Sequence, residues 1–446
     1  MIFLFASRRG VRSRYQGLRE VTVSAPRRRL AWTRRRGLLL FLVLVAAGLA
    51  ELGIYYWPQR LLFAARAALT RREYDAARAA LLVFLEARPN SAEAHLLLAQ
   101  LERRSNQYAD AAKHLDACQR LGGPSDAIEL ERALAAIQNG VYNTELDRLC
   151  YEHLSRKDAD QYLILEALSQ GFTKTYRLKE AMACLERMLV LQPDSSYALR
   201  RRAWLYSQAG QHDRAEADYR RTLEIDPEDS VARLGLAQIL LDLHKDGREA
   251  AEHFERLWAV QHDSTVALGL AQSWRLAGRG ADACRLLDDW LATHPTDAPA
   301  LAEQGRLALD EEATEKGVAL LRRAVALAPY LRDANYTLYL YLNKEGKTAE
   351  AEACQERMRQ AKKAREELAL LTQRSQAAPD DPDLRCRIGQ IFLHFGDERE
   401  GIRWLLTNLQ NHPRHAPSHL ALADYYDKQN QTARAAEHRR LAGTAP

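Results

Sequence analysis

The sequence contains little that would support catalysis, metal binding or a disulfide framework. It has six cysteines in 446 residues, and none of them forms a C-x-x-C pair. This spacing excludes zinc ribbons and thioredoxin-like sites. It also contains no glycine-rich phosphate loop, no H-E-x-x-H and no G-x-S-x-G motif. We therefore predict no catalytic residues, no metal site and no cofactor, and we expect the cysteines to be buried thiols.

The excess of basic over acidic residues is confined to the N-terminus. Residues 1–60 carry twelve arginines against two glutamates, a net charge of +10, whereas the whole chain carries only +5. The remainder is therefore slightly acidic. A protein that binds nucleic acid through its folded body needs a basic surface there. The charge distribution accordingly predicts no nucleic-acid partner.

The sequence has one long apolar run, residues 37–57 (GLLLFLVLVAAGLAELGIYYW). A helix of this length spans roughly 31 Å, close to the hydrocarbon core of a bilayer. Tyr55, Tyr56 and Trp57 would form an aromatic anchor at the interface. Eleven arginines precede the run, and the positive-inside rule places that end in the cytoplasm. We predict a basic, disordered cytoplasmic tail at 1–36 and a transmembrane helix at 37–57.

A cleavable signal peptide is the alternative for the same segment. The uncharged part, residues 37–50, has the length of a signal sequence, and Gly48–Ala50 could form a cleavage site. The long preceding tail and the aromatic belt favour a retained anchor. Both interpretations export the remainder of the chain, so we expect the body in the periplasm or otherwise outside the cytoplasm. With the retained anchor, the protein is a single-pass protein of the inner membrane.

Three classes of residue repeat with a period of 34. The prolines at 193, 227, 295 and 329 differ by 34 or by multiples of it, as do the glycines at 210, 278 and 346. Small residues keep the same interval at 181, 215, 283, 317 and 351. A fixed period of this length indicates stacked helix–turn–helix units. In each unit the glycine ends the first helix, the proline follows the second, and the small residues allow the two helices to touch.

This pattern resembles the tetratricopeptide repeat family. The unit at 264–297 carries the signature through Leu270, Ala271, Trp274, Ala283, Leu287 and Pro295. The resemblance implies an all-α, right-handed α-solenoid of about eleven repeats. We predict repeats over 58–360, a break at 361–381 formed by an extended helix and a loop, and further repeats over 382–446. Arg202 stands where the signature has leucine, which is a departure from it.

The resemblance implies that extended peptides or partner helices bind in the concave groove. The ninth place of the repeat is often glutamine, whose amide can both donate to and accept from a peptide backbone. Tryptophan and arginine are frequent binding anchors. The candidate groove residues are Gln170, Lys174, Arg200, Trp204, Gln208, Gln238, Gln272, Arg275 and Arg306. A merely polar, hydrated face is the alternative.

The sequence thus predicts a non-enzymatic, membrane-anchored scaffold that binds proteins at the bacterial envelope. The partner and the oligomeric state stay open. A second possibility is an import receptor of an organelle, which also joins an N-terminal anchor to such repeats. A third is an enzyme with an unrecognised site, which a deep pocket with perturbed ionisable groups would indicate.

Overall fold

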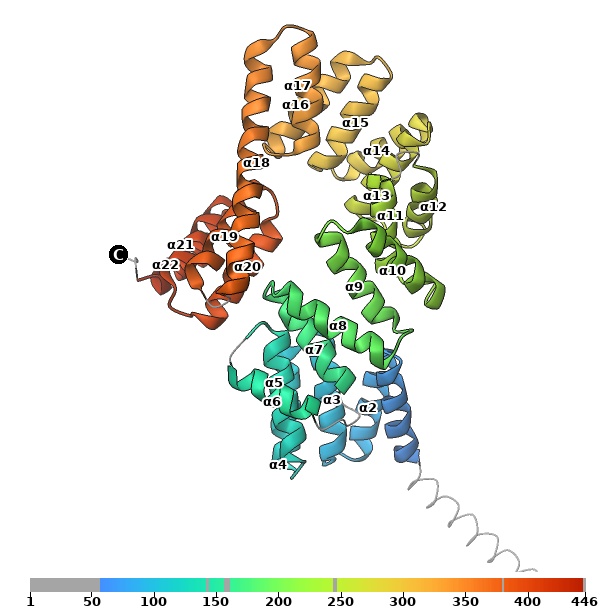
Figure 1. Ribbon diagram of the computed structural model, residues 1–446, viewed down its shortest axis with the longest axis vertical. Coiled ribbons are helices and arrows are strands. Elements are labelled where there is room, and N and C mark those ends of the chain that lie inside the picture. The colour runs from blue at the N-terminus through green and yellow to red at the C-terminus, as the bar shows by residue number, and fades with distance from the viewer. Residues whose placement is uncertain (1–56, 142–143, 156–160, 244–246, 379–380, 444–446) are drawn as a thin grey trace, which may run out of the picture. The chain divides into compact units, whose positions relative to one another are not determined.

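The computed structural model describes residues 57–141, 144–155, 161–243, 247–378 and 381–443, and these residues form helices and no strand (Figure 1). The first half contains α2 (Tyr74–Ala87), α3 (Ala92–Arg104), α4 (Tyr108–Arg120), α5 (Ser125–Gln138), α6 (Thr144–Ser155), α7 (Gln161–Lys174), α8 (Leu178–Leu191), α9 (Ser196–Gln208), α10 (His212–Ile225), α11 (Ser230–Leu243) and α12 (Arg248–Trp258). The second half contains α13 (Ser264–Leu276), α14 (Gly280–Thr293), α15 (Ala298–Asp310), α16 (Thr314–Leu327), α17 (Arg332–Lys344), α18 (Thr348–Ala377), α19 (Pro382–Phe395), α20 (Glu398–Asn411), α21 (Ala416–Lys428) and α22 (Thr432–Leu441).

The chain divides into two compact units, residues 1–94 and 95–446. In the described part of the first unit, residues 57–70 are helical and α2 follows them. The predicted tail at 1–36 and nearly all of the predicted transmembrane helix at 37–57 lie outside the described residues. Within the residues that are described, no helix has the length and apolar character needed to span a bilayer.

The periodic glycines and prolines mark the helix ends as predicted. Gly210, Gly278 and Gly346 follow α9, α13 and α17 with φ of 69°, 80° and 69°, a left-handed conformation that glycine adopts without a Cβ clash. Each periodic proline stands two residues after a second helix. Thus α10 ends at Ile225 before Pro227, and α16 ends at Leu327 before Pro329.

The predicted small residues lie where paired helices cross. A Cβ built on Gly305 of α15 would come within 3.0 Å of the Gly317 carbonyl oxygen in α16, and one on Gly317 within 2.9 Å of the Gly305 carbonyl oxygen. Gly389 and Gly401 form the same kind of crossing between α19 and α20. Ala203 and Ala215 are fully buried in the equivalent places of α9 and α10. The backbones are therefore too close for a larger side chain.

Arg202 replaces a core leucine and is accommodated by an ion pair. It donates to Asp218 of α10 from Nε at 2.7 Å and from Nη2 at 2.9 Å. Asp218 is buried, so this bidentate pair joins α9 to α10 where an apolar contact would normally do so.

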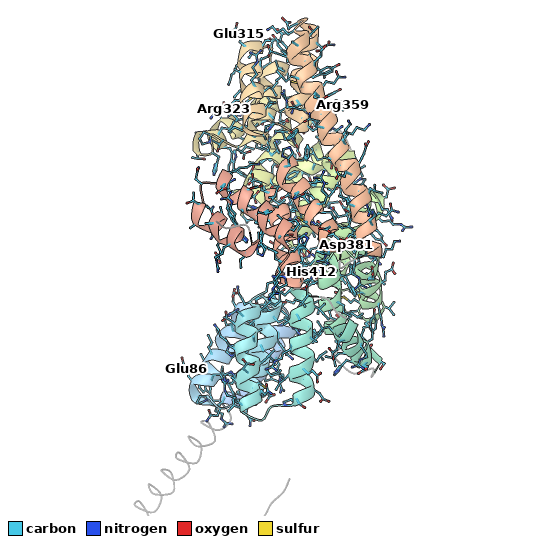
Figure 2. All side chains as sticks on the ribbon, turned by 90° about the vertical axis from the view of Figure 1, so that its left-hand side faces the viewer. Glu86, Glu315, Arg323, Arg359, Asp381 and His412 are labelled. Atoms are coloured by element: carbon cyan, nitrogen blue, oxygen red, sulfur yellow. The ribbon has the colours of Figure 1, made fainter. Side chains whose placement is uncertain are left out.

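The core is a chain of neighbouring clusters along the helices. One cluster spans Leu130 to Leu205, the next Ala203 to Leu270, and another Leu301 to Cys354. Each repeat therefore packs mainly against its neighbours, as in other repeat arrays. Five of the six cysteines are buried, as predicted, and Cys284 is partly exposed. Charged side chains such as Glu315 and Arg359 stand away from the ribbon into solvent (Figure 2).

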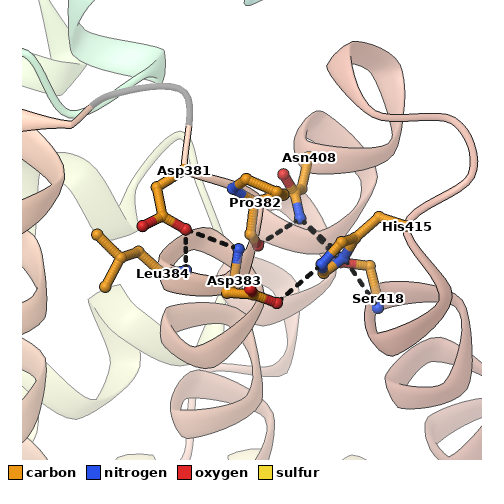
Figure 3. A network of polar contacts seen from close by, with 7 residues as sticks. All are labelled: Asp381, Pro382, Asp383, Leu384, Asn408, His415 and Ser418. Carbon is orange, nitrogen blue, oxygen red and sulfur yellow. Dashed lines mark hydrogen bonds and ion pairs between the residues drawn. The ribbon is translucent and has the colours of Figure 1, made fainter.

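The predicted extended helix is α18, which runs for 30 residues. The array resumes at α19, whose first turn is capped by the Asp381 side chain, which accepts from the backbone N–H groups of Asp383 and Leu384 at 3.0 and 3.1 Å. Asn408 of α20 donates to the Pro382 carbonyl and to Ser418 Oγ, both at 2.9 Å (Figure 3). This network fixes α19, α20 and α21 to one another after the long helix.

Candidate functional site

A cavity of about 440 Å³ in the second unit brings together cations and aromatic rings. We call it the basic pocket. Its cations come from α3, α7, α9 and α20 and are Arg104, Lys174, Arg200, Arg201 and Arg403. Its aromatic residues are Tyr108, Tyr197, Trp204 and Tyr219. No carboxylate lines the cavity, and the remaining lining residues are Asn106, Gln138, Gln170 and Val231.

Three of the cations lie over ring faces of the pocket. Lys174 Nζ is 5.7 Å from the ring centre of Tyr108, and the guanidinium carbons of Arg200 and Arg201 are 5.9 and 5.8 Å from the ring centres of Tyr197 and Trp204. Cation–π attraction of this kind positions a cation without neutralising it. The rings thus hold the cations at the cavity wall while their charge remains available.

The cations differ in their carboxylate partners. Arg200 lies 3.3 Å from Asp229, and Arg403 donates to Glu400 at 2.9 Å. In the part of the chain that the structure describes, no carboxylate lies within salt-bridge distance of Lys174, whose ammonium donates to Asn139 Oδ1 at 3.3 Å. Burial, and secondarily the charge of Arg403, lower the pKa of Lys174. The positive charge of the pocket is therefore only partly balanced.

The two arginines of α9 act electrostatically on Tyr219, which lines the pocket. Burial raises the pKa of Tyr219 to about 12, and the guanidinium groups of Arg200 and Arg201 act in the opposite direction. Tyr219, Arg200 and Arg201 all line the basic pocket. Tyr219 itself belongs to the buried core between α9 and α11, so the wall under these cations is fixed by packing.

A chain of side-chain hydrogen bonds connects several residues that line the pocket. Arg103 donates to Glu131 and to Gln138 Oε1, each at 2.6 Å. Gln138 Nε2 donates to Gln170 Oε1, and Gln170 Nε2 donates to the Tyr197 hydroxyl, each at 2.5 Å. The chain thereby links α3, α5, α7 and α9. A satisfied network of this kind holds the pocket wall in one arrangement.

Arg403 reaches the pocket because α20 contacts the turns after α5 and α7. The rings of Tyr176 and Trp404 are 4.3 Å apart, and the Tyr176 hydroxyl donates to Glu400 and accepts from Arg403 Nη2 at 3.2 Å. Asn411 Nδ2 donates to the Gly140 carbonyl at 3.4 Å. These contacts join segments that are more than 220 residues apart in the sequence. We call them the α20 contact.

The structure brings four of the nine predicted groove residues together. Gln170, Lys174, Arg200 and Trp204 line the basic pocket. The other five do not line it: Gln208, Gln238, Gln272, Arg275 and Arg306. Gln238 is exposed, whereas Arg275 donates to Glu303 of α15 at 2.6 Å, and Glu303 is only 4% exposed. Binding at any of the nine residues stays a prediction.

Sequence reasoning missed Arg104, Tyr108, Arg201 and Arg403 as pocket residues. The place of a residue within its repeat tells which face of a helix it occupies, and Arg201 directly follows Arg200, which was chosen on that basis. The place of Arg403 in its repeat does not predict that it lines the pocket, because this depends on the contact of α20 with repeats far away in the sequence. No group of three metal-binding side chains occurs among the described residues.

Comparison with family models decides the repeat type. One tetratricopeptide repeat model matches residues 168–239 and a second matches residues 64–126. Residues 64–126 and 168–239 therefore carry tetratricopeptide repeats. The match at 168–239 contains Lys174, Arg200, Arg201 and Trp204 of the basic pocket. No curated protein sequence matches the chain.

The chain is also similar to several solved structures. The APC/C hetero-tetramer Cut9–Hcn1 is 13% identical, with 90% of this chain and 95% of that chain covered and a TM-score of 0.32. A human IFIT1 dimer with PPP-AAAA is 17% identical, covering 79% and 90%, with a TM-score of 0.35. The C-terminal part of a repeat protein from Cytophaga hutchinsonii is 14% identical, covering 51% and 93%, with a TM-score of 0.38.

Proposed function

We propose that the protein is a membrane-anchored scaffold that binds other proteins at the bacterial envelope. Tetratricopeptide repeats mediate protein–protein interaction, and stacked repeats present extended surfaces suited to it. The fold is typically non-enzymatic. The N-terminal helix at 37–57 would hold the protein in the inner membrane with the repeats outside the cytoplasm, an inference from the arginine-rich tail.

One observation carries the binding hypothesis: four groove residues chosen from repeat places line a single cavity. Trp204 is 36% exposed at the wall of this cavity, so its ring is accessible to a partner. Aromatic side chains with accessible faces are common anchors in protein interfaces. Gln238, which is exposed on the following first helix α11, would extend the contact along the array.

A crosslinked pull-down from intact source cells tests this function. The full-length protein is compared with a variant carrying Trp204→Ala and Gln238→Ala, and with Val190→Ala as a control, because Val190 is 80% exposed on a second helix outside the pocket. We expect envelope proteins to be captured by the wild type and the control and lost in the double variant. Partners that survive the double variant would place binding on another surface.

A protease-accessibility measurement on spheroplasts tests the topology. The repeats should be cleaved from outside while a tag placed before residue 37 stays protected. Cleavage of the tag with the repeats protected would overturn the proposed orientation.

A further inference from the structure

The basic pocket holds two cations whose charge the described residues leave unbalanced. Arg200 and Arg403 have the carboxylates of Asp229 and Glu400 beside them. Lys174 and Arg201 have none within salt-bridge distance in the described ranges. The Arg201 guanidinium carbon lies 5.8 Å from the centre of the Trp204 ring.

This arrangement disfavours the charged form of Lys174. The pKa of Lys174 is lowered first by burial and then by Arg403, so its charged form is disfavoured there. Arg403 is contributed by α20 through the α20 contact, which places a second cation beside the first. Like charges held together in a partly dehydrated cavity attract an anion strongly, because the anion removes the repulsion and satisfies the donors.

The charge and size of the cavity favour a phosphate group over a single carboxylate. A phosphomonoester brings about two negative charges and several acceptor oxygens to one point, which matches two unbalanced cations. Guanidinium groups bind such oxygens in a fork, and an ammonium binds them as a point charge. The volume of about 440 Å³ exceeds what a phosphate alone needs and lies within the range of small-ligand sites. The rings of Tyr108 and Trp204 are available to the remainder of the ligand.

We propose that the basic pocket binds the phosphate group of a phosphorylated ligand through Lys174, Arg201 and Arg403. The site goes beyond the scaffold function, because its ligand is recognised by a phosphate group and not by the extended surface of the repeats. It is formed only when α20 lies against the turns after α5 and α7, since Arg403 comes from α20.

Titration of the full-length protein with inorganic pyrophosphate, followed by calorimetry, tests the site. We expect saturable binding that becomes at least tenfold weaker in Lys174→Met and in Arg201→Met, because each removes one charge-assisted contact. Arg306→Met is the matched control, a groove arginine outside the pocket, and should bind within about twofold of the wild type. Circular dichroism confirms that each variant is folded. Equal affinity in all four proteins, or no saturable binding of either pyrophosphate or the phosphopeptide of the second titration, would overturn the proposal.

A second titration separates the sources of the phosphate. It uses a phosphoserine peptide and the same peptide with glutamate in place of phosphoserine. Binding of pyrophosphate alone identifies a small phosphorylated molecule, and binding of the phosphopeptide alone identifies a phosphorylated protein; both support the site. If the glutamate peptide binds as tightly as the phosphopeptide, with the same dependence on Lys174, the pocket recognises carboxylates and the phosphate assignment is wrong. This result would leave the scaffold function standing.

Discussion

The basic pocket and the region of α13 and α15 both carry cations at predicted groove places, but in opposite electrostatic states. In the pocket, Lys174 has no carboxylate partner among the described residues and lies beside Arg403. In α13, Arg275 donates to Glu303, which is almost fully buried. A cation at a groove place is therefore part of the internal structure in one region and an unsatisfied charge in the other.

The difference shows that a repeat place alone does not define a binding residue. Glu303 belongs to the next first helix, so Arg275 is neutralised by its neighbour in the array. Lys174 faces Gln138, Gln170 and the aromatic wall, none of which carries a negative charge. A bound anion stabilises a cation such as Lys174 strongly, because no carboxylate among the described residues neutralises it. It stabilises Arg275 little, because Glu303 already neutralises that guanidinium.

The largest effect should come from breaking the neutralised pair. Arg275→Met would leave the Glu303 carboxylate buried without its cation, and the free energy of unfolding should fall by about 3 kcal/mol. Urea unfolding followed by circular dichroism measures this loss. Arg279→Met in the turn after α13 is the control, because Arg279 pairs with Glu255 and Asp282 at an exposed site and should cost less than about 1 kcal/mol. Equal losses in the two variants would mean that Arg275 is not the structural cation of its region.

A smaller effect should follow from disturbing the α20 contact. Gly140 has φ of 91°, and a Cβ there would lie 3.1 Å from Thr407 Cγ2 and 3.4 Å from Lys174 Cδ. Gly140→Ala should therefore cost about 2 kcal/mol, half from the left-handed backbone and half from the close approach. Gly210→Ala isolates the backbone part, because Gly210 has φ of 69° and open space around it. The unfolding midpoint in urea should fall further for Gly140→Ala, and equal shifts would show that α20 does not press on this site.

The sequence predicted the features that arise inside one repeat. The close crossing at Gly305 and Gly317 follows from a period of 34 and small side chains, and the long helix α18 follows from extra residues without a helix breaker. The α20 contact could not be predicted in this way. Whether Arg403 meets Lys174 depends on the small rotation between successive repeats, accumulated over more than 220 residues. The carboxylate that neutralises a groove cation, such as Glu303 for Arg275, comes from a neighbouring repeat. The pattern within one repeat therefore does not predict it.

The smallest effect on stability should come from the unbalanced cation itself. Lys174→Met removes a charge that the folded state disfavours and keeps the apolar stem, so the free energy of unfolding should change by less than about 1 kcal/mol, in the stabilising direction. The lowered pKa of Lys174 also determines the direction in which stability changes with pH. Between that pKa and the ordinary lysine value the unfolded chain binds more protons than the folded one, so the Lys174 contribution to stability rises with pH across this interval.

Below the lowered pKa the penalty from Lys174 is constant, and above the ordinary lysine value it vanishes. The wild type should therefore gain stability relative to Lys174→Met as the pH rises through the alkaline interval, and the two should converge above it. Urea unfolding of both proteins at matched pH values, with Lys428→Met as an exposed lysine control, measures the difference. A variant that is less stable than the wild type at neutral pH would mean that Lys174 has a structural partner, and the contrast with Arg275 would disappear.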